Sequence, residues 1–151
     1  READGWRFIA AEADRTITIT TPRGRTLQLR GRIDRVDEGA GGKVAVLDYK
    51  TRRPAQLRQA LLQPGEDVQL ATYALLWGGD IAAALFLSID RENVTPVEPR
   101  DDVNALAQAT RTRLAEVYDE MAAGAPLPAQ GTEDVCGYCD VRGLCRKNFW
   151  T

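Results

Sequence analysis

The chain has 151 residues, of which 44% are hydrophobic, and its 20 basic and 22 acidic residues leave a formal net charge of -2. This length and apolar content are enough to bury the core of one domain, so they exclude a chain that is disordered throughout. The near-neutral charge excludes nucleic-acid binding by bulk electrostatics, and an anionic partner would need a local basic patch.

The first third of the chain predicts antiparallel strands. Ile17 and Ile19 alternate with threonines, and Leu27 and Leu29 begin a second run of the same period, which is typical of half-buried strands. A glycine-rich tip, EGAGG, then separates this run from the returning strand KVAVLDYKT. We expect three or four strands, over residues 6–14, 15–21, 26–38 and 43–51.

Helices and one further strand follow. The polar residues 52–67 hold one short helix, and residues 68–79 have helical spacing that ends in a Gly-Gly pair, a common helix C-terminus. Residues 81–90 are almost continuously apolar, as expected for a strand covered on both faces. This order predicts an α/β or α+β sheet domain.

A long amphipathic helix is predicted over residues 101–124, with Asp101 or Asp102 placed to cap its start. A linker rich in proline and glycine follows it and leads to three closely spaced cysteines. We therefore expect a core over residues 1–125 and a linker with a cysteine-rich tail over residues 126–151.

The charges of the predicted hairpin stand out among apolar neighbours. Asp34 and Asp48 are symmetric about Gly41 in the glycine-rich tip, so a symmetric hairpin places the two carboxylates directly opposite each other, about 5 Å apart. Lys50 follows Asp48 by two residues and shares its face. Opposed like charges destabilise a sheet unless a cation lies between them, and Mg²⁺ prefers carboxylate oxygens.

An ordinary salt-bridge ladder at the surface, formed by these charges with Arg32, is the alternative interpretation. The apolar neighbours in VAVLDY favour a buried cluster instead, because charges are buried only where they are paired or bind metal. Histidine is absent from the chain, so the commonest general base and metal ligand is not available within it.

Three short stretches, GRIDRVD, VLDYKT and QLATY, resemble the PD-(D/E)XK nuclease superfamily and in particular its RecB-like branch. The resemblance implies a restriction-endonuclease-like core, a mixed sheet of about four to five strands flanked by helices. It also assigns Glu12 to an acidic position of the first strand. The implied catalytic residues are Asp34 and Asp48 as metal ligands together with the Tyr49 carbonyl, Lys50 as the catalytic lysine, and Gln69 and Tyr73 of a Q-x3-Y element.

The cysteine array C-x2-C-x5-C matches three ligands of the 4Fe–4S cluster that this branch often carries: Cys136, Cys139 and Cys145. Zinc is the alternative, with Asp140 or a residue beyond this chain as a fourth ligand. The family's fourth cysteine and the histidine of its N-terminal helix are both missing here. Either the chain begins after these residues or the protein has lost them. Because the chain lacks an initiator methionine and runs directly into a strand pattern, we expect it to be a piece of a longer protein, with a core that lacks the N-terminal helix.

The function implied by the resemblance is that of a Mg²⁺- or Mn²⁺-dependent deoxyribonuclease, an exonuclease within a helicase–nuclease of DNA repair and recombination. Four arginines near the cluster are candidates for holding the DNA backbone: Arg32, Arg35, Arg52 and Arg53. The expected partners are DNA and a helicase subunit or domain. With no signal peptide and no long apolar stretch, we expect a soluble, cytoplasmic protein and no membrane partner.

Two other functions compete with this one. A catalytically inactive scaffold of the same fold would bind DNA or a helicase, but it would have no need for opposed carboxylates that lack a cation. An unrelated protein clasped by zinc would contain zinc and no iron.

Overall fold

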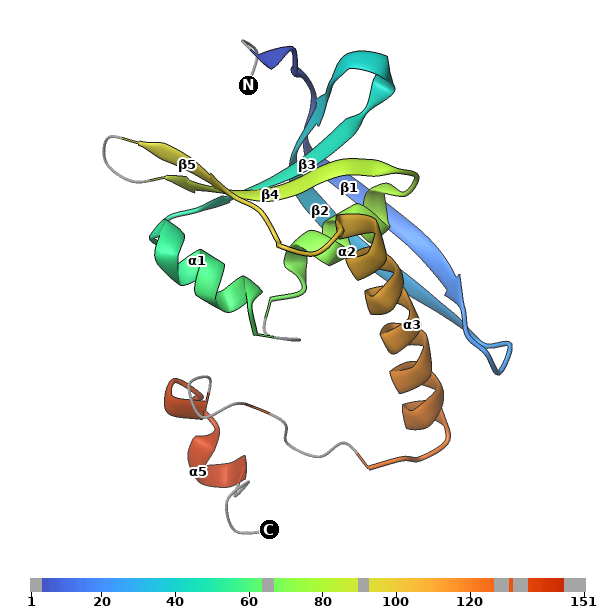
Figure 1. Cartoon of the computed structure of the whole chain (residues 1–151). Helices are drawn as coiled ribbons and strands as arrows, with labels where there is room; N and C mark the ends of the chain where they lie inside the picture. Colours follow the sequence, from blue (N-terminus) through green and yellow to red (C-terminus); the bar gives the residue numbers. More distant parts are fainter. Residues whose placement is uncertain (1–3, 64–66, 90–92, 127–130, 132–135, 146–151) are drawn as a thin grey trace. The chain divides into compact units, whose positions relative to one another are not determined.

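The computed structural model describes residues 4–63, 67–89, 93–126, 131 and 136–145. The chain divides into two units, Arg1–Asp119 and Glu120–Thr151, and the first unit contains the sheet (Figure 1). The boundary between the two units falls inside the last long helix.

A five-stranded mixed sheet forms the centre of the first unit. Its strands lie in the order β1-β2-β3-β4-β5. Strands β3 and β4 are parallel, and the other neighbours are antiparallel. Together with its flanking helices, this sheet confirms the predicted α/β fold of the restriction-endonuclease type. The strands are β1 (Arg7–Thr20), β2 (Thr26–Glu38), β3 (Val44–Lys50), β4 (Ile81–Ile89) and β5 (Val94–Val97).

Two strands differ from the expected ones. The two strands expected over residues 6–14 and 15–21 are one long strand, β1 (Arg7–Thr20), and its ladder to β2 continues on both sides of Glu12. Glu12 has a φ of 48°, in the left-handed region that a side chain with Cβ seldom adopts. Strand β5 was not expected, because it has only four residues and contains Pro96, which a sheet tolerates at its edge.

The helices follow the predicted order. Helix α2 ends where Gly78 has a φ of 78°, as the Gly-Gly pair predicted. The Asp102 carboxylate accepts a hydrogen bond from the Ala105 amide at 2.8 Å, so Asp102 caps α3. No helix in the described ranges has the length and apolar character needed to cross a membrane. The helices are α1 (Pro54–Leu61), α2 (Gln69–Trp77), α3 (Val103–Ala122) and α5 (Arg142–Cys145), with a 3-10 turn η2 (Ala40–Gly42).

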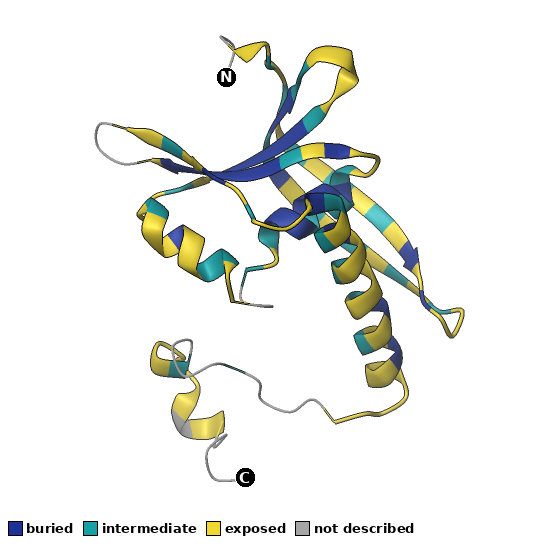
Figure 2. Cartoon of the chain, in the orientation of Figure 1, coloured by how far each residue is buried: buried dark blue, intermediate teal, exposed yellow. Residues whose placement is uncertain are grey.

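The core has two hydrophobic clusters that share strand β3. Successive β3 residues alternate between them, because side chains of a strand point to opposite faces. Buried residues are accordingly concentrated on β3, β4 and α2 (Figure 2). The larger cluster includes Leu57 of α1, Leu76 of α2 and Ala107 of α3 on Ile33, Val46 and Phe86 of the sheet. The smaller cluster contains Ala45, Leu47, Leu85 and Leu87, with Trp6 against them.

A glycine on β2 allows α2 to approach the sheet closely. A Cβ atom at Gly31 would lie 2.6 Å from the Leu76 Cδ1 atom, well inside van der Waals contact. Gly31 therefore leaves room for the Leu76 side chain of the helix that carries the Q-x3-Y residues.

The turn between β1 and β2 is tied to α3 through a buried carboxylate. Asp119 is only 4% exposed. It accepts hydrogen bonds from the Thr21 hydroxyl at 2.8 Å, the Arg23 amide at 3.0 Å and the Arg25 guanidinium at 3.0 Å. Burial alone would raise the pKa of Asp119, but these three donors outweigh it and lower the pKa below its usual value.

We expect Asp119→Asn to lower the melting temperature at neutral pH, because the amide cannot replace the charge that Arg25 pairs with. A lowered pKa means that the ionised carboxylate stabilises the fold above its unfolded pKa and that this contribution disappears as pH falls through the folded value. Thermal melts of wild type and variant across acidic and neutral pH should therefore converge at low pH. A difference that stays constant with pH would contradict this assignment.

Candidate active site

The hairpin of β2 and β3 closes in the predicted register. Arg35 pairs with Leu47 and Glu38 with Val44, so the ladder is symmetric about Gly41. Gly41 has a φ of 71°, which glycine adopts without steric cost. The ladder ends at Arg35 and Leu47, and Asp34 and Asp48 occupy the next position on each strand.

The two carboxylates meet at one hydroxyl group. The Tyr73 hydroxyl oxygen lies 3.3 Å from Asp34 Oδ1 and 3.2 Å from Asp48 Oδ1. Because a phenol has a single hydrogen to donate, it can bond only one of these oxygens at a time. The second oxygen of Asp34 accepts a hydrogen bond from the Tyr49 amide at 3.3 Å. The predicted pair of acids is therefore brought together.

Gln69 connects the carboxylates with the lysine. Its Nε2 donates to Asp48 Oδ1 at 2.6 Å and to the Tyr73 hydroxyl at 3.0 Å. Its Oε1 accepts a hydrogen bond from Lys50 Nζ at 2.5 Å. Gln69 and Tyr73 are i and i+4 on α2, so both reach the same side of the helix. The amide thus orients the lysine and one carboxylate at once.

Lys50 Nζ also lies 2.8 Å from Asp48 Oδ2. Its ammonium group is 5.2 Å from the centre of the Phe86 ring, a favourable cation–π distance. Phe86 is fully buried and pairs with Asp48 across the parallel strands. The Phe86 ring and the Gln69 side chain therefore hold the Lys50 ammonium group next to the Asp48 carboxylate.

The surroundings disfavour an isolated negative charge on Asp48. Asp48 is 2% exposed, and this burial raises the pKa of its carboxyl group. The ammonium group of Lys50 lowers this pKa, whereas the charge of Asp34 raises it further. Although Lys50 pairs with Asp48 Oδ2, that buried atom accepts no well-directed hydrogen bond within the described residues. Burial likewise raises the pKa of Tyr73, which keeps its hydroxyl protonated as a donor.

Two of the four predicted arginines are paired with acids. Arg32 Nε lies 2.8 Å from a Glu12 carboxylate oxygen, and both side chains are mostly exposed. Glu12 is therefore bound to Arg32. Arg35 Nε lies 2.7 Å from Asp37, which is fully buried. The bond to Asp37 raises the pKa of Arg35 above its ordinary value.

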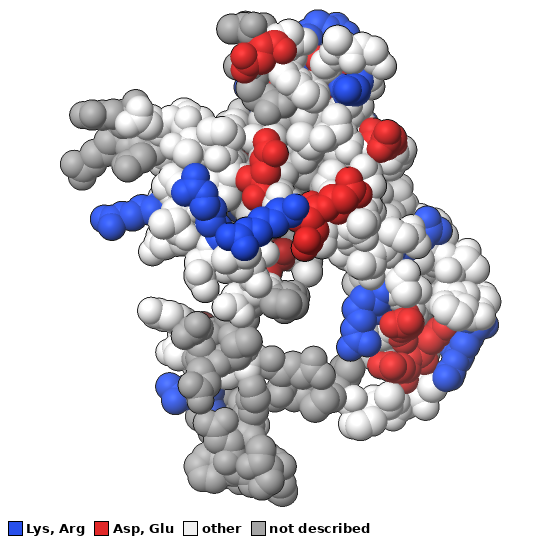
Figure 3. All heavy atoms as spheres, in the orientation of Figure 1, with Lys and Arg blue, Asp and Glu red and all other residues white. Residues whose placement is uncertain are grey.

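The other two arginines follow the lysine directly. Arg52 lines an open pocket next to Lys50, and Arg53 is the N-cap residue of α1. On the face that Figure 3 shows, described acidic and basic side chains lie side by side rather than forming one broad basic surface. Any DNA contact on this face therefore depends on individual arginines.

Sequence reasoning overlooked Phe86 and Ser88 at the end of β4. In the parallel pairing, Phe86 is opposite Asp48 and Ser88 is opposite Lys50. Ser88 is the single polar residue of the strand IAAALFLSI, and it is 1% exposed. A lone hydroxyl in an otherwise apolar strand is the sequence signal that could have identified Ser88.

The three cysteines of the tail have no disulfide partner. Among the residues whose positions the structure gives, no three or more histidine, cysteine, aspartate or glutamate side chains group to hold a metal. The iron–sulfur assignment therefore stays a prediction.

Comparison with known families identifies the superfamily of the chain. The sequence profile of the PD-(D/E)XK nuclease superfamily matches residues 1–146. The chain belongs to the PD-(D/E)XK nuclease superfamily. A solved structure described as "Crystal structure of SSO0001" is similar with a TM-score of 0.56 and 21% sequence identity, over 91% of this chain. The match spans 60% of that other chain, and it supports the fold alone. No curated protein matches the chain.

The site residues of this PD-(D/E)XK chain fit a hard divalent cation such as Mg²⁺ or Mn²⁺. Two carboxylates share one hydroxyl, and Asp48 Oδ2 is a buried acceptor without a well-directed donor in the described part of the chain. Oxygen donors of this kind suit Mg²⁺, which keeps several waters as further ligands. Asp34, Asp48 and the Tyr49 carbonyl could together hold the ion.

Proposed function

We propose that the chain is a metal-dependent DNA nuclease module that hydrolyses phosphodiester bonds as an exonuclease. The observation that carries the proposal is the convergence of both acids, the lysine and the Q-x3-Y pair in one hydrogen-bonded cluster. A structural salt bridge would need neither two opposed acids nor a buried acceptor without a well-directed donor.

In this mechanism the residues of the chain position the reactants. Asp34, Asp48 and the Tyr49 carbonyl would hold Mg²⁺ or Mn²⁺, and the bound ion would acidify water and stabilise charge on the phosphate. Lys50, held by Gln69 and Asp48, orients the attacking water and stabilises the added negative charge. The attacking water gives up a proton to solvent as its oxygen bonds to phosphorus, the ester P–O bond breaks, and the leaving oxygen takes up a proton from solvent.

The wider setting is also part of the proposal. The motif order of the RecB-like branch supports a module of a cytoplasmic helicase–nuclease that acts in DNA repair and recombination, with a helicase subunit or domain as partner. The spacing of the cysteines supports a 4Fe–4S cluster on Cys136, Cys139 and Cys145 in the whole protein, with its fourth ligand from elsewhere.

The test is degradation of end-labelled DNA by the full natural protein and by the 151-residue chain, each with Mg²⁺, Mn²⁺ or EDTA. We expect cleavage that requires the divalent ion and a product ladder that starts at the labelled ends. Thermal melts should show that the same ions raise the melting temperature, since a ligand that binds only the native state stabilises it.

Each outcome has a defined meaning. DNA binding without cleavage in the full natural protein under any of these ions would replace the nuclease with the scaffold function. Cleavage at internal sites of circular DNA would keep the nuclease and overturn the exonuclease assignment. Zinc without iron in the purified full protein would overturn the 4Fe–4S assignment.

A further inference from the structure

An open pocket of about 460 Å³ lies directly beside the proposed catalytic lysine. Its lining consists of Lys50, Arg52, Asp67, Val68 and Gln69. Lys50 and Gln69 belong to the cluster that surrounds Asp48. Whatever fills this pocket therefore lies next to the group that Lys50 acts on.

The pocket carries more positive than negative charge. Its lining contains two cations, Lys50 and Arg52, and one carboxylate, Asp67. Lys50 is also paired with Asp48, so Arg52 is the cation of the lining that has no ion pair within the described residues. The Asp67 carboxylate oxygen Oδ1 accepts a hydrogen bond from the main-chain N–H of Gln69 at 3.1 Å. Val68 is 49% exposed and adds an apolar surface. Such a lining suits an anionic group attached to a partly apolar one, as in a nucleotide.

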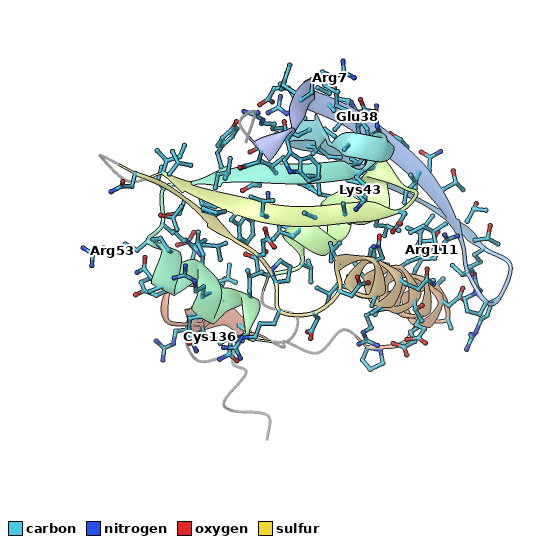
Figure 4. The ribbon with its side chains drawn as sticks, turned by 45° about the horizontal axis from the view of Figure 1, so that its top comes forward. Arg7, Glu38, Lys43, Arg53, Arg111 and Cys136 are labelled. Atoms are coloured by element: carbon cyan, nitrogen blue, oxygen red, sulfur yellow. The ribbon has the colours of Figure 1, made fainter. Side chains whose placement is uncertain are left out.

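Among the four predicted arginines, Arg52 is the one that lines the pocket and has no ion pair within the described residues. Arg32 is paired with Glu12 and Arg35 with Asp37, whereas no carboxylate in the described part of the chain forms an ion pair with Arg52. Arg53 does not line the pocket. In Figure 4 its side chain points outward, away from the sheet.

The main chain at Arg52 is fixed from two sides. The buried hydroxyl of Ser88 donates a hydrogen bond to the Arg52 carbonyl at 2.7 Å. One residue later, the Arg53 amide donates to the Gln56 side chain at 3.3 Å, where α1 begins. These bonds fix the main chain on both sides of the residue whose side chain lines the pocket. A fixed main chain reduces the freedom that the arginine loses when it binds a phosphate.

We propose that this pocket binds the DNA backbone phosphate next to the one that is cleaved, with Arg52 as its ligand and Ser88 as the residue that positions Arg52. This inference rests on the proposed nuclease function and specifies how its substrate is held. Arg52 binds the phosphate and takes no part in bond cleavage, which Lys50 and the two acids carry out. Its loss should therefore weaken substrate binding more than it slows cleavage.

The test uses single-stranded oligonucleotides that each carry one uncharged methylphosphonate at a different position. Cleavage by the full natural protein is measured with Mn²⁺. For wild type we expect one position next to the cleaved bond at which the methylphosphonate raises KM by about 10-fold, the value of a lost charge-assisted hydrogen bond. In Arg52→Ala, KM should be about 10-fold higher on unmodified DNA, with kcat nearly unchanged. In Arg52→Ala, the methylphosphonate at that position should not raise KM any further.

The control variants show whether the effect comes from the position of Arg52 or only from the loss of one positive charge. Arg111→Ala removes an equal charge from the exposed face of α3 and should leave KM unchanged. Arg53→Ala should keep the position-dependent penalty. Ser88→Ala should raise KM, as Arg52→Ala does. Ser88→Thr keeps the hydroxyl and should have the KM of the wild type. Thermal melts verify that each variant is folded.

The outcomes distinguish this inference from the function on which it rests. An active protein whose methylphosphonate penalty persists in Arg52→Ala, or whose KM does not respond to that change, overturns the pocket and leaves the nuclease intact. A wild-type protein that neither binds nor cleaves DNA overturns the nuclease itself. Equal KM values for Ser88→Ala and wild type overturn the positioning role alone.

Discussion

Replacing Asp48 with asparagine is expected to reduce DNA cleavage by about 10³-fold or more, because metal-ion stabilisation of the transition state is worth several kcal/mol. Asp48 is the most buried member of the cluster and contacts Lys50, Gln69 and Tyr73. The measurement is the single-turnover cleavage rate with Mn²⁺. Asp14→Asn, which changes an exposed acid on β1, is the matched control and should cleave like wild type.

The same variant should not be destabilised in the absence of metal. Since the pKa of Asp48 is raised by burial, its contribution to stability is fully present below the unfolded pKa and is lost as pH rises through the folded value. At neutral pH the ionised carboxylate therefore lowers the stability of the metal-free fold, and asparagine removes that charge. We expect a metal-free melting temperature at or above that of wild type, and no increase on adding Mn²⁺. Cleavage at the wild-type rate by Asp48→Asn would overturn the assigned site.

Replacing Lys50 with methionine is expected to slow cleavage by about 10²- to 10³-fold, as for other donors that stabilise transition-state charge. Methionine keeps an apolar stem next to Phe86 and removes the ammonium group that contacts Asp48 and Gln69. In contrast to the Asp48 variant, this protein should still be stabilised by Mn²⁺. Melting curves and single-turnover rates measured on the same samples would show this difference.

The pH dependence adds a second test of Lys50. Lys50 lowers the pKa of Asp48, so its removal should raise that pKa further, and metal binding by Lys50→Met should require a higher pH than in wild type. Lys43→Met removes an equal charge at the exposed hairpin tip (Figure 4) and serves as the control. If Lys50→Met cleaves as fast as Lys43→Met, the lysine has a structural role only.

Local sequence patterns were sufficient for most of the elements and for the centre of the site. The symmetric spacing of Asp34 and Asp48 about Gly41 predicted a register that the structure confirms. A strand period of two placed Lys50 with Asp48, and a helix period of nearly four placed Gln69 with Tyr73. These relations hold within one hairpin or one helix turn, so they need no knowledge of the tertiary structure.

Tertiary structure decided what lies around that centre. The four predicted arginines have the same sequence signature of a basic residue near the acids. Only the tertiary structure distinguishes their surroundings: Glu12 and Asp37 form ion pairs with two of them, and the Ser88 hydroxyl donates a hydrogen bond to the main chain of a third. Neither the parallel pairing of β3 with β4 nor the position of Phe86 beneath Lys50 follows from local spacing.

The sequence by itself therefore determined which residues carry charge and which of them share a face, because strand and helix periods depend only on the backbone. Which charges are neutralised, buried or left available was decided by the tertiary structure. Those properties depend on partners that are distant in the chain, such as Asp119 for Thr21 and Arg25 or Gln69 for Lys50, and on the low-dielectric surroundings that only packing creates.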